Sequence, residues 1–143
     1  MKEKLILENE IGNVFKNFPV FPDNVKEILV KIAPFLAMVG VLFGGLALLA
    51  VAGIGAGLSN IGALAYGSTA QYYISMAILA VMVALEAMAI SPLLKRQKKG
   101  WDLMYYTQLL GLVSNLITLS IVGFILSFVI GFWILFQVRP KYN

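Results

Sequence analysis

The chain has 143 residues, of which 60% are hydrophobic, and it carries a net charge of +4 with no Cys and no His. Soluble domains are roughly 45–50% apolar, so this composition excludes an ordinary soluble fold. Without Cys or His there are no disulfides and none of the usual transition-metal ligands, and we expect neither a metal nor a cofactor.

Residues 1–22 are expected to form a peripheral segment. They lack the continuous apolar stretch of a secretory signal peptide. Their apolar residues recur at helical spacing, which predicts a short amphipathic helix that ends at Pro19 and Pro22. Such a helix lies either on the membrane surface or on the protein's own helices, and the pattern favours neither. The apolar stripe consists of Leu7, Ile11, Val14, Phe15 and Phe18, and Glu8 lies off it.

Long stretches without charge follow, and they predict membrane-spanning helices. Between Lys31 and Lys95 the only charged residue is Glu86. A soluble fold interleaves charged and apolar faces, so hydrocarbon is the expected surrounding of this stretch. We expect the first two spans at about 32–56 and 71–94.

The stretch 103–138 contains 36 residues without a charge. As one helix it would be about 54 Å long, nearly twice the roughly 30 Å of a hydrocarbon core. Two spans, at about 101–118 and 121–138, joined by a turn near Thr118–Ile121, fit better. The sequence therefore predicts an all-α fold, a four-transmembrane-helix bundle with an N-terminal amphipathic helix.

The distribution of basic residues predicts the topology. All eleven Lys and Arg lie in the N-terminal segment, in the loop 95–99 or in the tail 139–141. With four spans they all lie on one side, which the positive-inside rule makes cytoplasmic. We expect a multi-pass protein of the cell (inner or plasma) membrane with both termini in the cytoplasm. It would consist of a peripheral segment, 1–22, and a four-span domain, 23–143.

Small residues recur at helical spacing on three of the spans. Helices in lipid associate where small residues let their backbones approach, so these seams are expected to pack the bundle. The expected packing residues are Gly40, Gly44, Ala80, Ala84, Ala87, Gly123, Ser127 and Gly131.

The third span carries a polar face instead. Its polar and small residues fall within about 120° of arc at the helical repeat of 100° per residue. Polar side chains there seek partners across the helix interface. Structural cross-linking of one bundle is the favoured interpretation, and a water-lined path or ligand groove is the alternative. The face consists of Thr107, Gln108, Gly111, Ser114, Asn115 and Thr118.

Glu86 lies about 13 Å in from the cytoplasmic boundary, close to the bilayer midplane. No Lys or Arg within a span can pair with it, so we expect it to be protonated or to reach Gln108 or Asn115 on the third span. It is either a proton or ion site or a neutral acid that fixes helix register. The candidate polar-core site consists of Glu86, Gln108, Asn115, Ser114 and Thr118.

Three short segments, KIAPFL at 31–36, KKGWDL at 98–103 and FQVR at 136–139, resemble those of small, uncharacterised four-helix integral membrane proteins of bacteria. The likeness covers most of the chain but rests on interfacial motifs, so it implies the fold and no activity. Small multidrug transporters also have four spans and one membrane Glu. Their acid is in the first span, whereas Glu86 is in the second, so the sequence does not indicate that family.

No enzyme is expected, and no catalytic residue, because a Ser with a base, two facing acids or an H-E-x-x-H site cannot be assembled. The expected function is that of a non-enzymatic membrane subunit or scaffold that associates through small-residue seams. The alternative is a proton- or ion-coupled small transporter or channel that uses the mid-membrane Glu. Expected partners are membrane lipids and a second copy or a partner membrane subunit. Nucleic acid is not expected, since no folded basic domain lies behind the basic residues.

Overall fold

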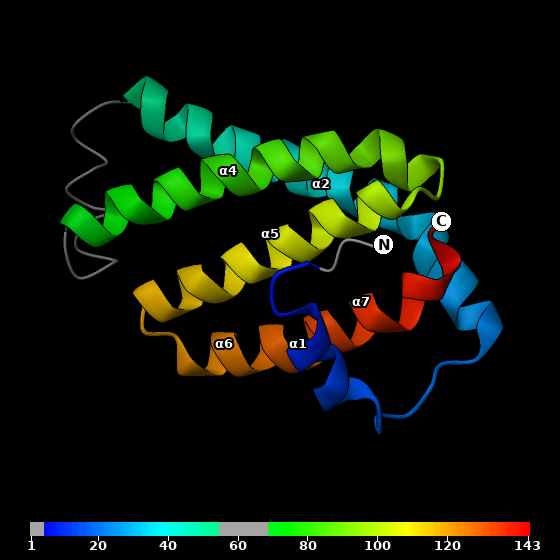
Figure 1. Ribbon diagram of the computed structural model, residues 1–143. Coiled ribbons are helices and arrows are strands. Elements are labelled where there is room, and N and C mark those ends of the chain that lie inside the picture. Colours follow the sequence, from blue (N-terminus) through cyan, green and yellow to red (C-terminus); the bar gives the residue numbers. More distant parts are fainter. Residues whose placement is uncertain (1–4, 55–68) are drawn as a thin grey trace.

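The computed structural model of the chain describes residues 5–54 and 69–143 (Figure 1), and all regular elements within these residues are helical. The all-helical prediction is confirmed for this part of the chain. The elements are α1 (Glu8–Phe15), α2 (Asp23–Ile54), α4 (Thr69–Leu94), α5 (Lys98–Ile117), α6 (Ile121–Leu126), the π-helix η1 (Ser127–Gly131), α7 (Phe132–Val138) and the 3-10 helix η2 (Arg139–Lys141).

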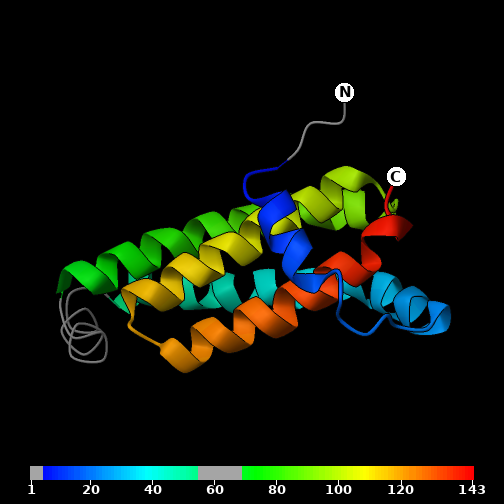
Figure 2. The same ribbon diagram turned by 60° about the horizontal axis from the view of Figure 1, so that its bottom comes forward.

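Four long rods lie side by side: α2, α4, α5 and the continuous run of α6, η1 and α7 (Figures 1 and 2). α4 packs against both α2 and α5, and α5 packs against the last rod, while α2 also touches α7 and η2. The start of α2, the turn between α4 and α5, and the C-terminus lie together at one end, on the right in Figure 1. We call this the basic end, because the Lys and Arg residues of the described chain are concentrated there.

Three of the rods are long and apolar enough to cross a membrane, namely α2, α4 and the run from α6 to α7. Large apolar side chains such as Phe35, Phe43 and Val122 are exposed on them, as expected for surfaces that meet lipid. α5 is not one of the three, because Asp102, Gln108 and other polar residues lower its hydropathy. The helices thus define a membrane protein, as the composition predicted.

The turn between α5 and α6 consists of residues 118–120. Leu119 adopts a left-handed conformation with a φ of 55°, and the Ser120 N–H donates to the Asn115 carbonyl over 2.9 Å. The Ser120 hydroxyl then accepts from the Gly123 N–H and caps α6. A left-handed position usually favours Gly, but Leu119 occupies it here. For this reason the sequence contains no residue typical of a turn at this position.

α1 packs on the protein's own helices, which decides between the two positions that its sequence allowed. Ile11 and Phe15 are buried, and the Phe15 ring lies 5.6 Å from Phe128 and 6.3 Å from Phe136 of the last rod. Leu7 and Val14, which belong to the same apolar stripe, remain about half exposed. The structure therefore uses only part of the amphipathic face to bind the bundle.

Candidate functional site

Glu86 lies on the side of α4 that faces α2. Its carboxyl group occupies the space above Gly40, where a Cβ atom would overlap with Oε2. Among the described residues this carboxyl makes no hydrogen bond or ion pair. The expectation that Glu86 points toward the third span is wrong, because α4 has neighbours on two sides and the acid falls on the α2 side.

The amides of α5 bind the last rod instead of Glu86. Gln108 Nε2 donates to the Ser127 carbonyl over 2.8 Å, and Asn115 Nδ2 donates to the Ser127 hydroxyl over 3.2 Å. Gly131 and Gly123 flank this contact: a Cβ at Gly131 would be 2.6 Å from Gln108 Cδ, and one at Gly123 would be 2.8 Å from Asn115 Oδ1. We call these five residues the amide seam.

The amide seam coincides with η1, the π-helical turn from Ser127 to Gly131. A π-turn shifts the backbone hydrogen bonds from i+4 to i+5 and is often found at functional positions of helices. Here it presents the Ser127 carbonyl to Gln108. No Pro marks this turn in the sequence, and nothing in the pattern of small residues could have predicted it.

The two threonine hydroxyl groups on the polar face donate to carbonyls of their own helical segment. Thr118 Oγ1 donates to the Ser114 carbonyl and Thr107 Oγ1 to the Leu103 carbonyl, each over 3.0 Å. Ser114 lines a cavity of about 290 Å³ between α4 and α5, together with Ser75. Gly111 and Asn115 line the same cavity, so the polar face meets α4 as well as the last rod.

The predicted alanine stripe of α4 is not buried against another described helix. Ala80, Ala84 and Ala87 are exposed in the described chain, whereas Leu79 and Val83 pack against Gly44 of α2. Gly40 and Gly44 lie at the α2–α4 contact. The role of the stripe in helix packing stays a prediction.

Two polar clusters at the basic end were not predicted. In the first, Nη1 and Nη2 of Arg96 donate to the Glu27 carboxylate, the shorter contact being 2.8 Å. Lys141 Nζ lies 3.1 Å from Glu27 and 2.6 Å from Asp23. Glu27 is in the charged first turns of α2, ahead of its apolar stretch. Hydrogen bonds from Arg96, which has the larger effect, and from Lys141 hold the pKa of the Glu27 carboxyl below its ordinary value.

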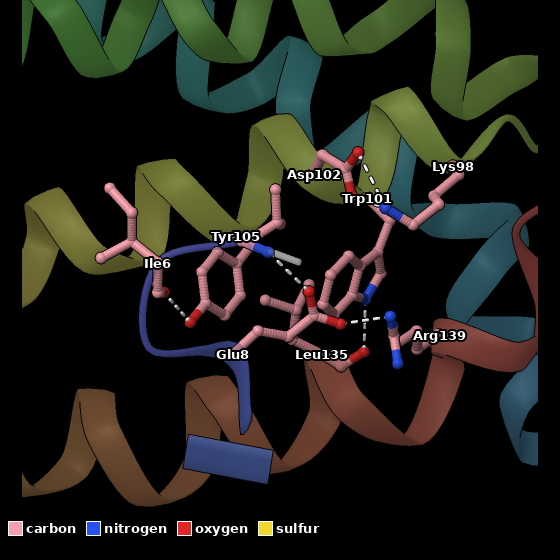
Figure 3. A network of polar contacts seen from close by, with 9 residues as sticks. Ile6, Glu8, Lys98, Trp101, Asp102, Tyr105, Leu135 and Arg139 are labelled. Atoms are coloured by element: carbon pink, nitrogen blue, oxygen red, sulfur yellow. Dashed lines mark hydrogen bonds and ion pairs between the residues drawn. The ribbon is translucent and has the colours of Figure 1, made fainter. Parts of the chain in front are cut away.

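The second cluster anchors α1 (Figure 3). Glu8 is only 4% exposed, pairs with Arg139, and accepts from the Leu5 N–H over 2.9 Å. The Arg139 guanidinium lies 5.1 Å from the centre of the Trp101 ring, a cation–π contact. The sequence placed Glu8 off the apolar stripe and did not predict its burial. No sequence signal could reveal a partner 131 residues away, at position 139.

Hydrogen bonds from α5 complete the second cluster. Trp101 Nε1 donates to the Leu135 carbonyl and the Tyr105 hydroxyl donates to the Ile6 carbonyl, both over 2.7 Å. Trp101 and Tyr105 are fully buried and their ring centres are 5.4 Å apart. These contacts hold α1, α5 and the last rod together. Among the residues that the structure describes, no cluster of acidic side chains could bind a metal ion.

No protein-family model matches the chain, and no curated protein or solved structure matches it either. The three apolar helices indicate the class of a helical membrane protein. The resemblance to small bacterial membrane proteins stays an expectation from the sequence.

Proposed function

We propose that this chain is a four-span, multi-pass protein of the cell membrane with both termini in the cytoplasm. It acts as a non-enzymatic subunit or scaffold that associates with a second copy or with a partner membrane subunit. The observation that carries the proposal is the exposure of Ala80, Ala84 and Ala87 on α4, whose other faces bind α2 and α5. In lipid, a stripe of small residues favours close helix contact.

The position of α5 supports four spans. It lies between α4 and the last rod, and the amides of Gln108 and Asn115 bond to Ser127. Their polar groups are satisfied inside the protein, which is the condition for a moderately polar helix to cross hydrocarbon. The concentration of basic residues at one end of all four rods supports cytoplasmic termini.

The surroundings of Glu86 favour a scaffold over a transporter. Glu86 lines none of five cavities in the described part of the chain. A transport path would need to bring water or ions to this acid. Its carboxyl is packed over Gly40 instead.

The oligomeric state of the purified protein tests the proposal. Ala84→Leu adds bulk to the proposed contact, and Ala47→Leu is the matched control, because Ala47 is also an exposed alanine, on α2. Overpacking costs about 1–3 kcal/mol, so the dissociation constant of the oligomer should rise about tenfold or more in Ala84→Leu alone. A monomeric parent, or an equal effect of both variants, would refute self-association.

A second candidate function, proton or ion coupling, is favoured by one observation. The Glu86 carboxyl has no polar partner among the described residues, and an unpaired acid within a membrane is by default a functional hypothesis. Glu86→Gln should abolish pH-dependent flux in liposomes if the acid carries protons. Liposomes of the parent protein that show no flux above protein-free liposomes would exclude this function.

A further inference from the structure

A cavity of about 260 Å³ lies at the basic end, between the N-terminal segment, the start of α2 and the last rod. Phe15, Phe18 and Phe136 form an aromatic floor, and Lys16 and Lys26 line the same cavity. No carboxylate lines it. A neighbouring cavity is also lined by cationic and aromatic residues, but both of its cations are paired: Lys98 with Asp102 and Arg139 with Glu8.

Hydrogen bonds hold one wall of this cavity in place. The Pro19 carbonyl accepts from Trp133 Nε1 over 3.1 Å and from Gln137 Nε2 over 3.2 Å. The Phe21 N–H donates to Gln137 Oε1 over 3.1 Å. The Phe18 ring also packs edge-on against Trp133, with centres 5.7 Å apart. The segment between α1 and α2 is thus fixed to α7, and the cavity is formed before any ligand binds.

The charges of Lys16 and Lys26 are not neutralised. Neither lysine makes a hydrogen bond or ion pair within the described chain, whereas Arg96, Arg139 and Lys141 each pair with a carboxylate. The unpaired positive charge therefore faces a cavity that can accept an anion. Lys95 and Lys99 are also unpaired, but they line none of the five cavities.

We propose that this cavity binds an anionic phospholipid of the cytoplasmic leaflet, with its phosphate between Lys16 and Lys26 and its glycerol and first methylene groups on the aromatic floor. Anionic lipids concentrate at the cytoplasmic surface, where each basic residue contributes to attraction. A free phosphate would use the two ammonium groups but not the three Phe rings. The proposal rests on the membrane location of the chain and not on its role as a subunit.

Native mass spectrometry of the full chain in detergent tests it, with phosphatidylglycerol and phosphatidylcholine as the probes. The parent should bind phosphatidylglycerol at least tenfold more tightly than phosphatidylcholine. In the double variant Lys16→Gln/Lys26→Gln, affinity for phosphatidylglycerol should fall about 30-fold, or about fivefold for each lysine. The matched control Lys95→Gln/Lys99→Gln removes the same charge at the same end and should bind like the parent.

Two further variants test the site without removing a lysine. Val20 lines the cavity and is 71% exposed, so Val20→Glu should repel the phosphate without disturbing the fold. Val14, half exposed on α1, lies outside the cavity lining and gives the control Val14→Glu. Equal losses in both glutamate variants, or in both double Lys variants, would mean diffuse attraction and overturn the site. Displacement of phosphatidylglycerol by millimolar inorganic phosphate would overturn the assignment to a lipid.

Discussion

The surroundings of Gly100 and Gly45 predict opposite effects for a Gly→Ala substitution at each position. Gly100, in the first turn of α5, lies against the end of α4, and a Cβ there would be 2.7 Å from the Leu93 nitrogen and 3.0 Å from the Pro92 carbonyl carbon. Both are backbone atoms, so neither can rotate away. Gly45 in α2 has no atom within 4 Å of its Cβ position.

Overpacking typically costs about 1–3 kcal/mol, and backbone neighbours place Gly100→Ala toward the upper end. The gain in helix propensity, about 1 kcal/mol, offsets part of this, so the net loss is about 2 kcal/mol. In Gly45→Ala the added methyl group contacts no neighbouring atom, so the free energy of unfolding should rise by up to about 1 kcal/mol. The two variants should differ by about 3 kcal/mol in the free energy of unfolding.

Reversible unfolding in mixed detergent micelles would measure this difference, followed by far-ultraviolet circular dichroism and by tryptophan fluorescence. Trp101 is next to Gly100 and fully buried, so its emission reports on the α4–α5 contact. If Gly100→Ala were as stable as the parent, the close approach of α5 to α4 would not exist. A loss of the same size in Gly45→Ala would show that the effect is not specific to the contact.

Three further predictions use other parts of the chain. Gly40→Ala should destabilise the α2–α4 contact by about 1–3 kcal/mol, because the added methyl group meets the Glu86 carboxyl. In a double-mutant cycle, Glu86→Ala should relieve most of that loss, and additive effects would refute the contact. A single Cys at Ser68 should react with an impermeant reagent in intact cells while one at Lys99 stays silent, and the reverse would refute cytoplasmic termini. Because the folded-state pKa of Glu27 is lowered, its stabilising contribution is present above the ordinary pKa of 4.5 and is lost as pH falls through the folded-state pKa. Glu27→Gln should remove this part of the pH dependence of the free energy of unfolding. An unchanged pH dependence would argue against the ion pairs.

The sequence alone determined the class of protein and much of its helical layout. Uncharged stretches longer than a soluble fold tolerates require lipid as the surrounding solvent, and a charge-free stretch too long for one crossing requires a turn. That turn is found at residues 118–120, within the range expected from length alone. The four-residue spacing of Gly123, Ser127 and Gly131 also marked the face that meets the amides of α5, because spacing along a helix defines its faces.

Tertiary structure alone decided which neighbour each face meets. Periodicity placed Glu86 on one side of α4, but only the packing of the helices turned that side toward Gly40 and away from Gln108. The burial of Glu8 likewise depends on Arg139, at the opposite end of the chain. Local sequence carries no information about such distant pairs. They form because three-dimensional packing brings the two groups together and satisfies a buried charge that neither segment could hold alone.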